Sequence, residues 1–169
     1  MSEKKLVVDG LELTYKGLFD LDGLLKKIDE TTHTRGYAKV EKRRQELVKK
    51  EGKEFSMELR PTKIKSEYES IMIKIRLNIT DLKEVEVLID KKKNKLQEGN
   101  IAMVFDAWKT TDWKWRWEKK PGIYFLRTLV DKFIKRFHQG RHEGELIEDT
   151  QYVYTNVKGY LQLHRYLVD

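Results

Sequence analysis

The residues that could do chemistry gather in one stretch of the chain, where tryptophans alternate with cations. Residues 112–118 read Asp-Trp-Lys-Trp-Arg-Trp-Glu, and the fourth tryptophan of the chain, Trp108, lies just before them. Period-two alternation is typical of a β-strand, so the rings are expected on one face of the strand and the cations on the other. The rings and the cations therefore cannot serve the same flat surface.

The aromatic face has three interpretations. The rings can pack as core beneath a helix, because aromatic side chains bury large areas. They can line a pocket for a small apolar ligand, or they can stack on bases as an exposed platform. Core packing needs the least further explanation. The ligand pocket would be lined by aromatic and aliphatic side chains of this strand and the segment after it, namely Trp113, Trp115, Trp117, Leu126, Val130 and Phe133.

Basic residues are concentrated in the same part of the chain. Residues 91–141 contain 14 Lys and Arg against 5 Asp and Glu, and the whole chain has a net charge of +7. Such a segment favours a polyanionic partner, contacted through phosphates without base readout. A solvated basic face is the simpler alternative. The predicted nucleic-acid-binding residues are Lys91, Lys92, Lys93, Lys95, Lys114, Arg116, Lys119, Lys120, Lys132, Lys135, Arg136 and Arg141.

Metal and catalytic motifs are weaker. His138 and His142 have the spacing of two zinc ligands on a helix, but Gly140 falls between them and no third ligand is suitably spaced. The paired carboxylates Glu84 and Glu86 are expected on a solvated strand face and not in the cleft that acid–base catalysis needs. No nucleophile elbow, phosphate-binding loop or dinucleotide fingerprint occurs. We therefore predict no metal, no cofactor, no catalytic residue and no enzymatic activity.

Hydrophobic periodicity predicts the elements that position these residues. Residues 11–16 alternate as a strand, and Asp20 is a suitable N-cap for a helix that closes near Gly36. Residues 37–50 have helix-forming composition without a clean helical stripe, so they are either a helix or a charged edge strand.

An antiparallel meander with one solvated face is predicted next. Its strands alternate over residues 55–59, 71–79, 85–89 and 101–107, with a hairpin turn at residues 91–94. An amphipathic helix over residues 122–137 then carries a stripe wide enough to cover a sheet.

The predicted fold class is α+β, an antiparallel meander sheet packed on a long C-terminal helix, with an N-terminal strand–helix unit. Residues 1–138 are expected to form a single domain, followed by a polar linker over 139–144 and an aromatic tail to residue 169. This tail could dock as a strand or helix, or hold a protein partner.

The order of elements over about residues 11–137 resembles the helix-grip (START-like) arrangement. That resemblance implies a curved sheet around the last helix, often with an apolar cavity between them. Two segments are similar to segments of small uncharacterised archaeal α+β proteins. One is the sequence Lys-Gly-Leu-Phe-Asp-Leu-Asp-Gly-Leu-Leu at residues 16–25, and the other is the strand pair around residues 71–88.

Composition restricts the class of protein. There is no cysteine, the N-terminus lacks the apolar run of a signal peptide, and no stretch approaches the roughly 20 apolar residues of a membrane span. Charged residues make up 37% of the chain, which is typical of thermophile proteins. We expect a cytoplasmic, non-enzymatic module without a membrane partner that binds RNA or a ribonucleoprotein surface such as the ribosome. The alternatives are a carrier of a small apolar ligand and a protein-interaction subunit.

Overall fold

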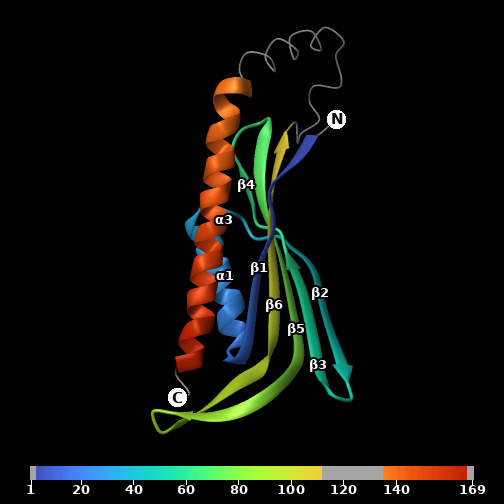
Figure 1. The fold of residues 1–169 in the computed structure, drawn as a ribbon, viewed down its shortest axis with the longest axis vertical. Helices are drawn as coiled ribbons and strands as arrows, with labels where there is room; N and C mark the ends of the chain where they lie inside the picture. The colour runs from blue at the N-terminus through green and yellow to red at the C-terminus, as the bar shows by residue number, and fades with distance from the viewer. Residues whose placement is uncertain (1–2, 112–134, 167–169) are drawn as a thin grey trace.

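The computed structural model describes residues 3–111 and 135–166, and gives the backbone alone for residues 41, 42 and 135–141. It confirms the α+β class, with an N-terminal strand–helix unit and a long C-terminal helix packed on an antiparallel sheet (Figure 1). The elements in chain order are β1 (Glu3–Phe19), α1 (Leu21–Thr34), β2 (Glu41–Lys49), β3 (Gly52–Leu59), β4 (Thr62–Ile64), β5 (Glu69–Ile89), β6 (Lys92–Thr111) and α3 (Lys135–Tyr166).

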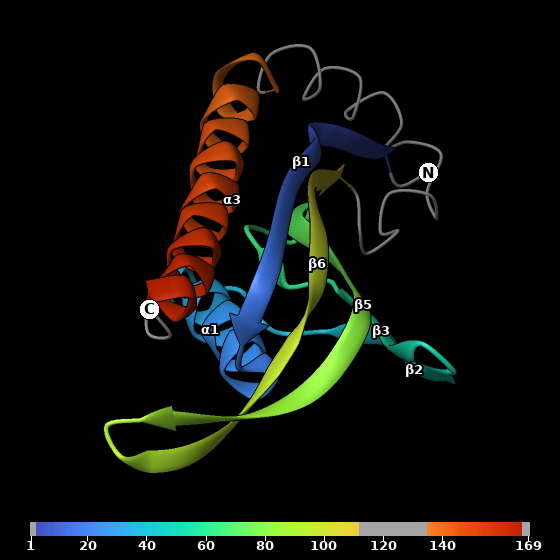
Figure 2. The same cartoon turned by 60° about the horizontal axis from the view of Figure 1, so that its bottom comes forward.

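The described helices cover one face of the sheet. The strands lie in the order β1-β6-β5-β3-β2, with β4 paired to β5, and all pairings are antiparallel. Of the described residues, the helices α1 and α3 lie on the same side of this curved sheet (Figure 2). We call that side the inner face and the opposite side the outer face.

The core lies between the inner face and the two helices. Alternate residues of β5 from Ile71 to Ile79 are at most 1% exposed, because strand side chains alternate between the faces. Phe19 of β1 and Phe105 of β6 are completely buried among them. The helices complete this core with aliphatic side chains, which are Leu24 and Ile28 of α1 and Leu146, Val153, Val157 and Leu161 of α3.

Residues 37–50, for which the sequence left helix and strand open, contain the edge strand β2. Its residues pair with β3 from Glu41 opposite Leu59 to Lys49 opposite Gly52. The helix propensity of this segment is worth only tenths of a kcal/mol per residue. Pairing with β3 overrides it.

The predicted strands 71–79 and 85–89 are one strand, β5. The interruption between them is a register shift between Thr80 and Lys83, where Asp81 has a φ of 55°. Gly52 lies against this bulge, since a Cβ at that position would stand 3.1 Å from the Asp81 Cα. The β5–β6 turn is at residues 90–91 rather than over the predicted 91–94.

Residues 139–144, predicted as a polar linker, belong to α3. Glycines cost about 1 kcal/mol each in a helix interior, and the sequence prediction ended the helix at them. Packing of α3 further along offsets that cost, because Val153 and Val157 are completely buried. The tail is therefore a helix docked on the core. Most of the helix predicted over 122–137 lies outside the described residues.

Replacing Gly23 with alanine tests how closely the helices approach. A Cβ at this position of α1 would fall against the Tyr160 hydroxyl of α3 and 2.7 Å from an Asp20 carboxylate oxygen. Although alanine favours helix by about 1 kcal/mol, we expect Gly23→Ala to lower the free energy of unfolding by about 1–3 kcal/mol through overpacking. Urea denaturation measures this change.

The control for that substitution removes the nearer of the two obstructing atoms. Adding Tyr160→Phe to Gly23→Ala should restore part of the lost stability, because the phenyl ring lacks the hydroxyl that the new methyl group meets, while the Asp20 carboxylate stays. A Gly23→Ala protein as stable as the native chain would show that α1 and α3 do not pack this closely.

Candidate functional site

A two-stranded arm projects from the sheet at one end of the molecule. Pairing of β1 with β6 ends at Phe19 opposite Gln97, and pairing of β3 with β5 ends at Lys53 opposite Leu82. Beyond these positions β5 and β6 continue only with each other, to Ile89 opposite Lys92. We call residues 85–96 the arm, which extends from the end of the sheet in Figures 1 and 2.

The turn at the end of the arm places its lysines. Asp90 and Lys91 both have positive φ angles, 51° and 64°, which is the backbone of a type I′ turn that suits the twist of a two-stranded ribbon. Lys92 and Lys93 follow immediately in β6. All four lysines from Lys91 to Lys95 are therefore carried at the tip of the arm.

These four arm lysines are exposed and outnumber the two acidic residues of the arm, Glu86 and Asp90. Within the described part of the chain, none of them makes an ion pair, whereas some other cations do, such as Arg76 with Asp106 at 2.8 Å. Lys95 lies opposite Glu86 in the strand register, so its charge is the most offset of the four. The tip presents ammonium groups to solvent.

The structure does not bring the whole predicted basic set together. The backbone of Lys135, Arg136 and Arg141 lies at the start of α3, at the end of the molecule opposite the arm (Figure 1). The 20 residues of β6 separate these ends, a path of roughly 60 Å at about 3.3 Å per residue. The remaining predicted basic residues and all of the pocket residues are outside the described residues, namely Lys114, Arg116, Lys119, Lys120, Lys132, Trp113, Trp115, Trp117, Leu126, Val130 and Phe133.

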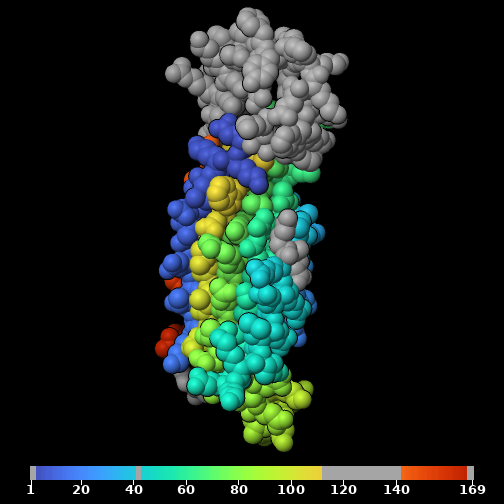
Figure 3. Space-filling model, turned by 90° about the vertical axis from the view of Figure 1, so that its right-hand side faces the viewer, coloured from blue at the N-terminus to red at the C-terminus, as the bar shows by residue number. Residues whose placement is uncertain are grey.

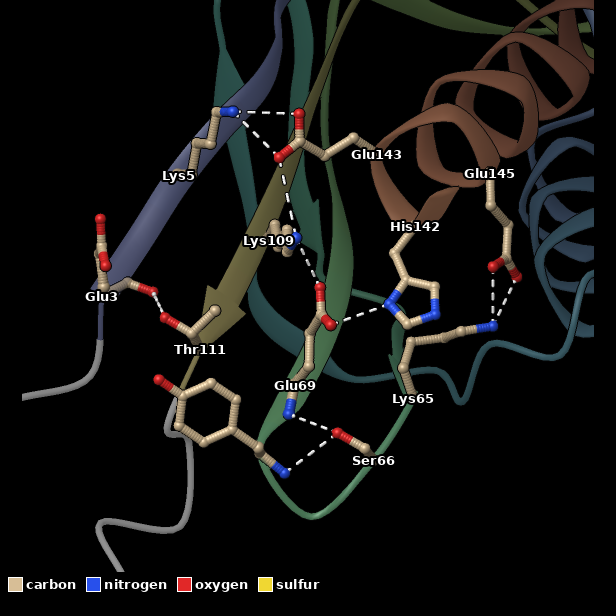
Figure 4. Close-up of polar contacts among 11 residues, drawn as sticks. Glu3, Lys5, Lys65, Ser66, Glu69, Lys109, Thr111, His142, Glu143 and Glu145 are labelled. Atoms are coloured by element: carbon tan, nitrogen blue, oxygen red, sulfur yellow. Dashed lines mark hydrogen bonds and ion pairs between the residues drawn. The ribbon is translucent and has the colours of Figure 1, made fainter. Parts of the chain in front are cut away.

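A second polar feature lies between α3 and the sheet, near the end of β6 (Figure 4). Lys109 of β6 is only 4% exposed, and its Nζ is 2.7 Å from the Glu69 carboxylate of β5. The other Glu69 oxygen is 2.8 Å from His142 Nδ1 of α3. Glu143 of α3 accepts from Lys5 of β1 at 3.0 Å and lies 3.7 Å from Lys109. These pairs tie α3 to three strands.

The pairs continue along α3 toward the end of α1. Lys63 and Lys65 approach the Glu145 carboxylate to 2.6 and 2.7 Å. Tyr37 donates a hydrogen bond of 2.9 Å to Asp149, which is 3% exposed and also 3.9 Å from Lys63. We call this whole set the charged network. Because each of its carboxylates is held by a cation or a hydroxyl, it supports anchoring of α3 rather than acid–base chemistry.

Burial and pairing shift pKa values in the charged network. Burial raises the pKa of the Asp149 carboxyl, although the Tyr37 hydrogen bond and Lys63 oppose that shift. Burial and the neighbouring Asp149 raise the pKa of the Tyr37 hydroxyl. Burial would raise the pKa of Glu145 too, but hydrogen bonds from Lys63 and Lys65 outweigh it and lower this pKa to about 2.

The lowered pKa of Glu145 therefore predicts that the folded protein loses stability in acid. Its folded pKa of about 2 is below the ordinary 4.5, so its contribution is present above pH 4.5 and is lost as the pH falls toward 2. We expect Glu145→Gln to flatten the dependence of unfolding free energy on pH in that window. Urea titrations at several pH values measure the slope, and an unchanged slope would remove Glu145 as its source.

The charged network was not predicted, although the sequence holds a signal for it. Glu69 and Lys109 continue the inner-face alternation of Ile71 and Ala107, so each places a charge where the pattern predicts an apolar residue. His142, weighed above as a metal ligand, instead contacts Glu69. Among the described side chains, no group of three His, Asp or Glu is arranged to hold a metal ion.

Comparisons with known proteins identify no relative. No family of proteins matches the chain, and neither the curated proteins nor the solved structures contain a significant match. Among the helices of the described ranges, none combines the length and apolar character that crossing a bilayer requires.

Proposed function

We propose that this protein is a non-enzymatic module that binds RNA or a ribonucleoprotein surface, and that the arm is one of its contact elements. The observation that carries the proposal is the set of four exposed, unpaired lysines at the tip of a projecting ribbon. Ammonium groups bind phosphates by charge, and a contact of this kind releases counterions without reading base sequence. The arm is thus suited to position the protein on a structured RNA.

The shape of the arm supports the same proposal. A two-stranded ribbon without neighbouring strands is marginally stable in water by itself, and Leu88 in this ribbon is 69% exposed. Contact with a large partner would stabilise such an element. The proposal also includes five predicted basic residues outside the described residues, for which charge is the only argument. They are Lys114, Arg116, Lys119, Lys120 and Lys132.

The carrier alternative follows from the resemblance to the helix-grip arrangement, in which a ligand lies between sheet and helix. In the described part of this chain, fully buried side chains such as Phe19, Phe105 and Leu161 lie in that position. Further along α3 the charged network replaces an apolar wall. This packing argues against a ligand cavity in the described part of the chain, whereas the predicted pocket residues lie outside it.

Fluorescence anisotropy with a labelled RNA hairpin tests the proposal. If the four arm lysines contact phosphates, the logarithm of the association constant should fall with the logarithm of salt concentration with a slope of about −3. Contacts by further lysines would make the slope steeper. Absence of binding at low salt, or a flat salt dependence, would reject the proposal.

A further inference from the structure

The strand β2 is an unpaired edge of the sheet. It pairs with β3 on one side, and within the described residues no strand lies on its other side. Figure 3, viewed from the β2 side, shows the cyan atoms of β2 and β3 at the surface. Leu47 and Val48 of this strand are 55% and 76% exposed. A nine-residue edge with exposed aliphatic side chains is a template for pairing with another strand.

The order of charges in β2 is complementary to itself. In an antiparallel pair of two β2 strands with Gln45 opposite Gln45, Arg44 of each copy lies opposite Glu46 of the other. Residues directly opposite each other share a face of the sheet and have Cβ atoms about 5 Å apart. The same register puts Leu47 opposite Arg43 of the other copy, whose alkyl stem can cover it.

Neighbouring registers lack this complementarity. Centring the pair on Arg44 places two arginines opposite each other, and centring it on Glu46 places two glutamates opposite each other. Like charges directly opposite are destabilising. Among these three registers, the charge pattern therefore selects the one centred on Gln45.

We propose that the chain forms a symmetric dimer through antiparallel pairing of β2 with β2 of a second copy, about a two-fold axis at Gln45. Arg44 and Glu46 are exposed on the inner face, where Arg44 lies over the Phe55 ring with its Cζ 5.4 Å from the ring centroid. No described helix covers them, so the second copy has access. Pairing joins the two sheets into one, and residues of one strand alone make an interface near the small end of the range for stable dimers. The dimer is expected to depend on protein concentration.

Sedimentation of the intact chain over a range of concentrations tests the dimer. The mass should rise from 20.3 kDa toward twice that value. Arg44→Glu places glutamates opposite each other and should raise the dissociation constant about ten-fold or more. Glu46→Arg should act likewise. The double variant Arg44→Glu/Glu46→Arg restores opposite charges and should restore the dimer, whereas Lys53→Glu on β3 should leave it unchanged.

A cysteine placed at the axis tests the register. The native chain has no cysteine, so oxidised Gln45→Cys should give a covalent dimer, because only this position faces itself. Arg43→Cys and Leu47→Cys place their thiols four residues out of register, roughly 13 Å apart, beyond the reach of a disulfide. A monomer at every concentration, a dimer that survives each single charge reversal unweakened, or equal cross-linking at the three positions would each overturn the proposal.

Discussion

Replacing Lys109 with alanine is expected to lower the free energy of unfolding by about 3–5 kcal/mol, the cost of removing one partner of a buried ion pair. The Lys109 side chain is 4% exposed and that of Glu69 is 12% exposed. Without the ammonium group, Glu69 keeps His142 at 2.8 Å but loses its nearest full charge. The remaining carboxylate is then buried without adequate compensation.

Two comparisons separate this effect from the loss of any lysine. Lys49→Ala removes an equally short ion pair, 2.6 Å to Glu54, but that lysine is 61% exposed, so the change should cost less than about 1 kcal/mol. The double variant Lys109→Met/Glu69→Met should be milder than Lys109→Ala, because it leaves no unpaired buried charge. Urea denaturation measures all three, and equal losses for Lys109→Ala and Lys49→Ala would mean that the charged network does not anchor α3.

Reversing the four arm lysines to glutamate is expected to weaken RNA binding by about 10²–10³-fold at low salt. The change removes four phosphate contacts and adds repulsion at the point where the RNA approaches. The global stability should be little changed, because Lys91, Lys92, Lys93 and Lys95 are exposed and make no ion pair in the described part of the chain.

Net charge alone could also weaken RNA binding, and a matched variant removes that explanation. The matched variant changes four exposed lysines outside the arm, which are Lys4, Lys16, Lys26 and Lys50. Reversing these four to glutamate gives the same net charge as reversing the arm lysines. A contact at the arm predicts a much smaller loss for this variant, since only the long-range field changes.

The alternating segments of the sequence predicted the fold well. The run from Ile71 to Ile79 and the alternation from Ile101 to Ala107 form the centre of the sheet, because their period fixes which side chains face the core. The helix after Asp20 was likewise predicted from its apolar spacing and occupies residues 21–34. Local patterns sufficed where one face of an element is buried.

The sequence predicted less where distant residues decide the structure. Pairing with β3 makes residues 41–49 a strand despite their helix propensity, and packing of residues such as Val153 keeps α3 helical through Gly144. The charge count over residues 91–141 drew attention to the arm lysines, but it could not show that β6 separates them from the start of α3. The alternation marks Lys109 as a charge on the inner face, but its ion pairs join elements far apart in the chain, so no local pattern predicts its partners.

The most direct test of the proposed function compares three proteins in one assay. The affinity for a labelled RNA hairpin is measured by anisotropy at about 50 mM salt, because phosphate contacts are strong at low salt. The three proteins are the native chain, the variant with the four arm lysines reversed, and the variant with Lys4, Lys16, Lys26 and Lys50 reversed. We predict that the arm variant loses about 10²-fold or more, while the matched variant stays within about ten-fold of the native chain. Equal losses in the two variants, or no RNA binding by the native chain, would contradict a role for the arm in binding RNA.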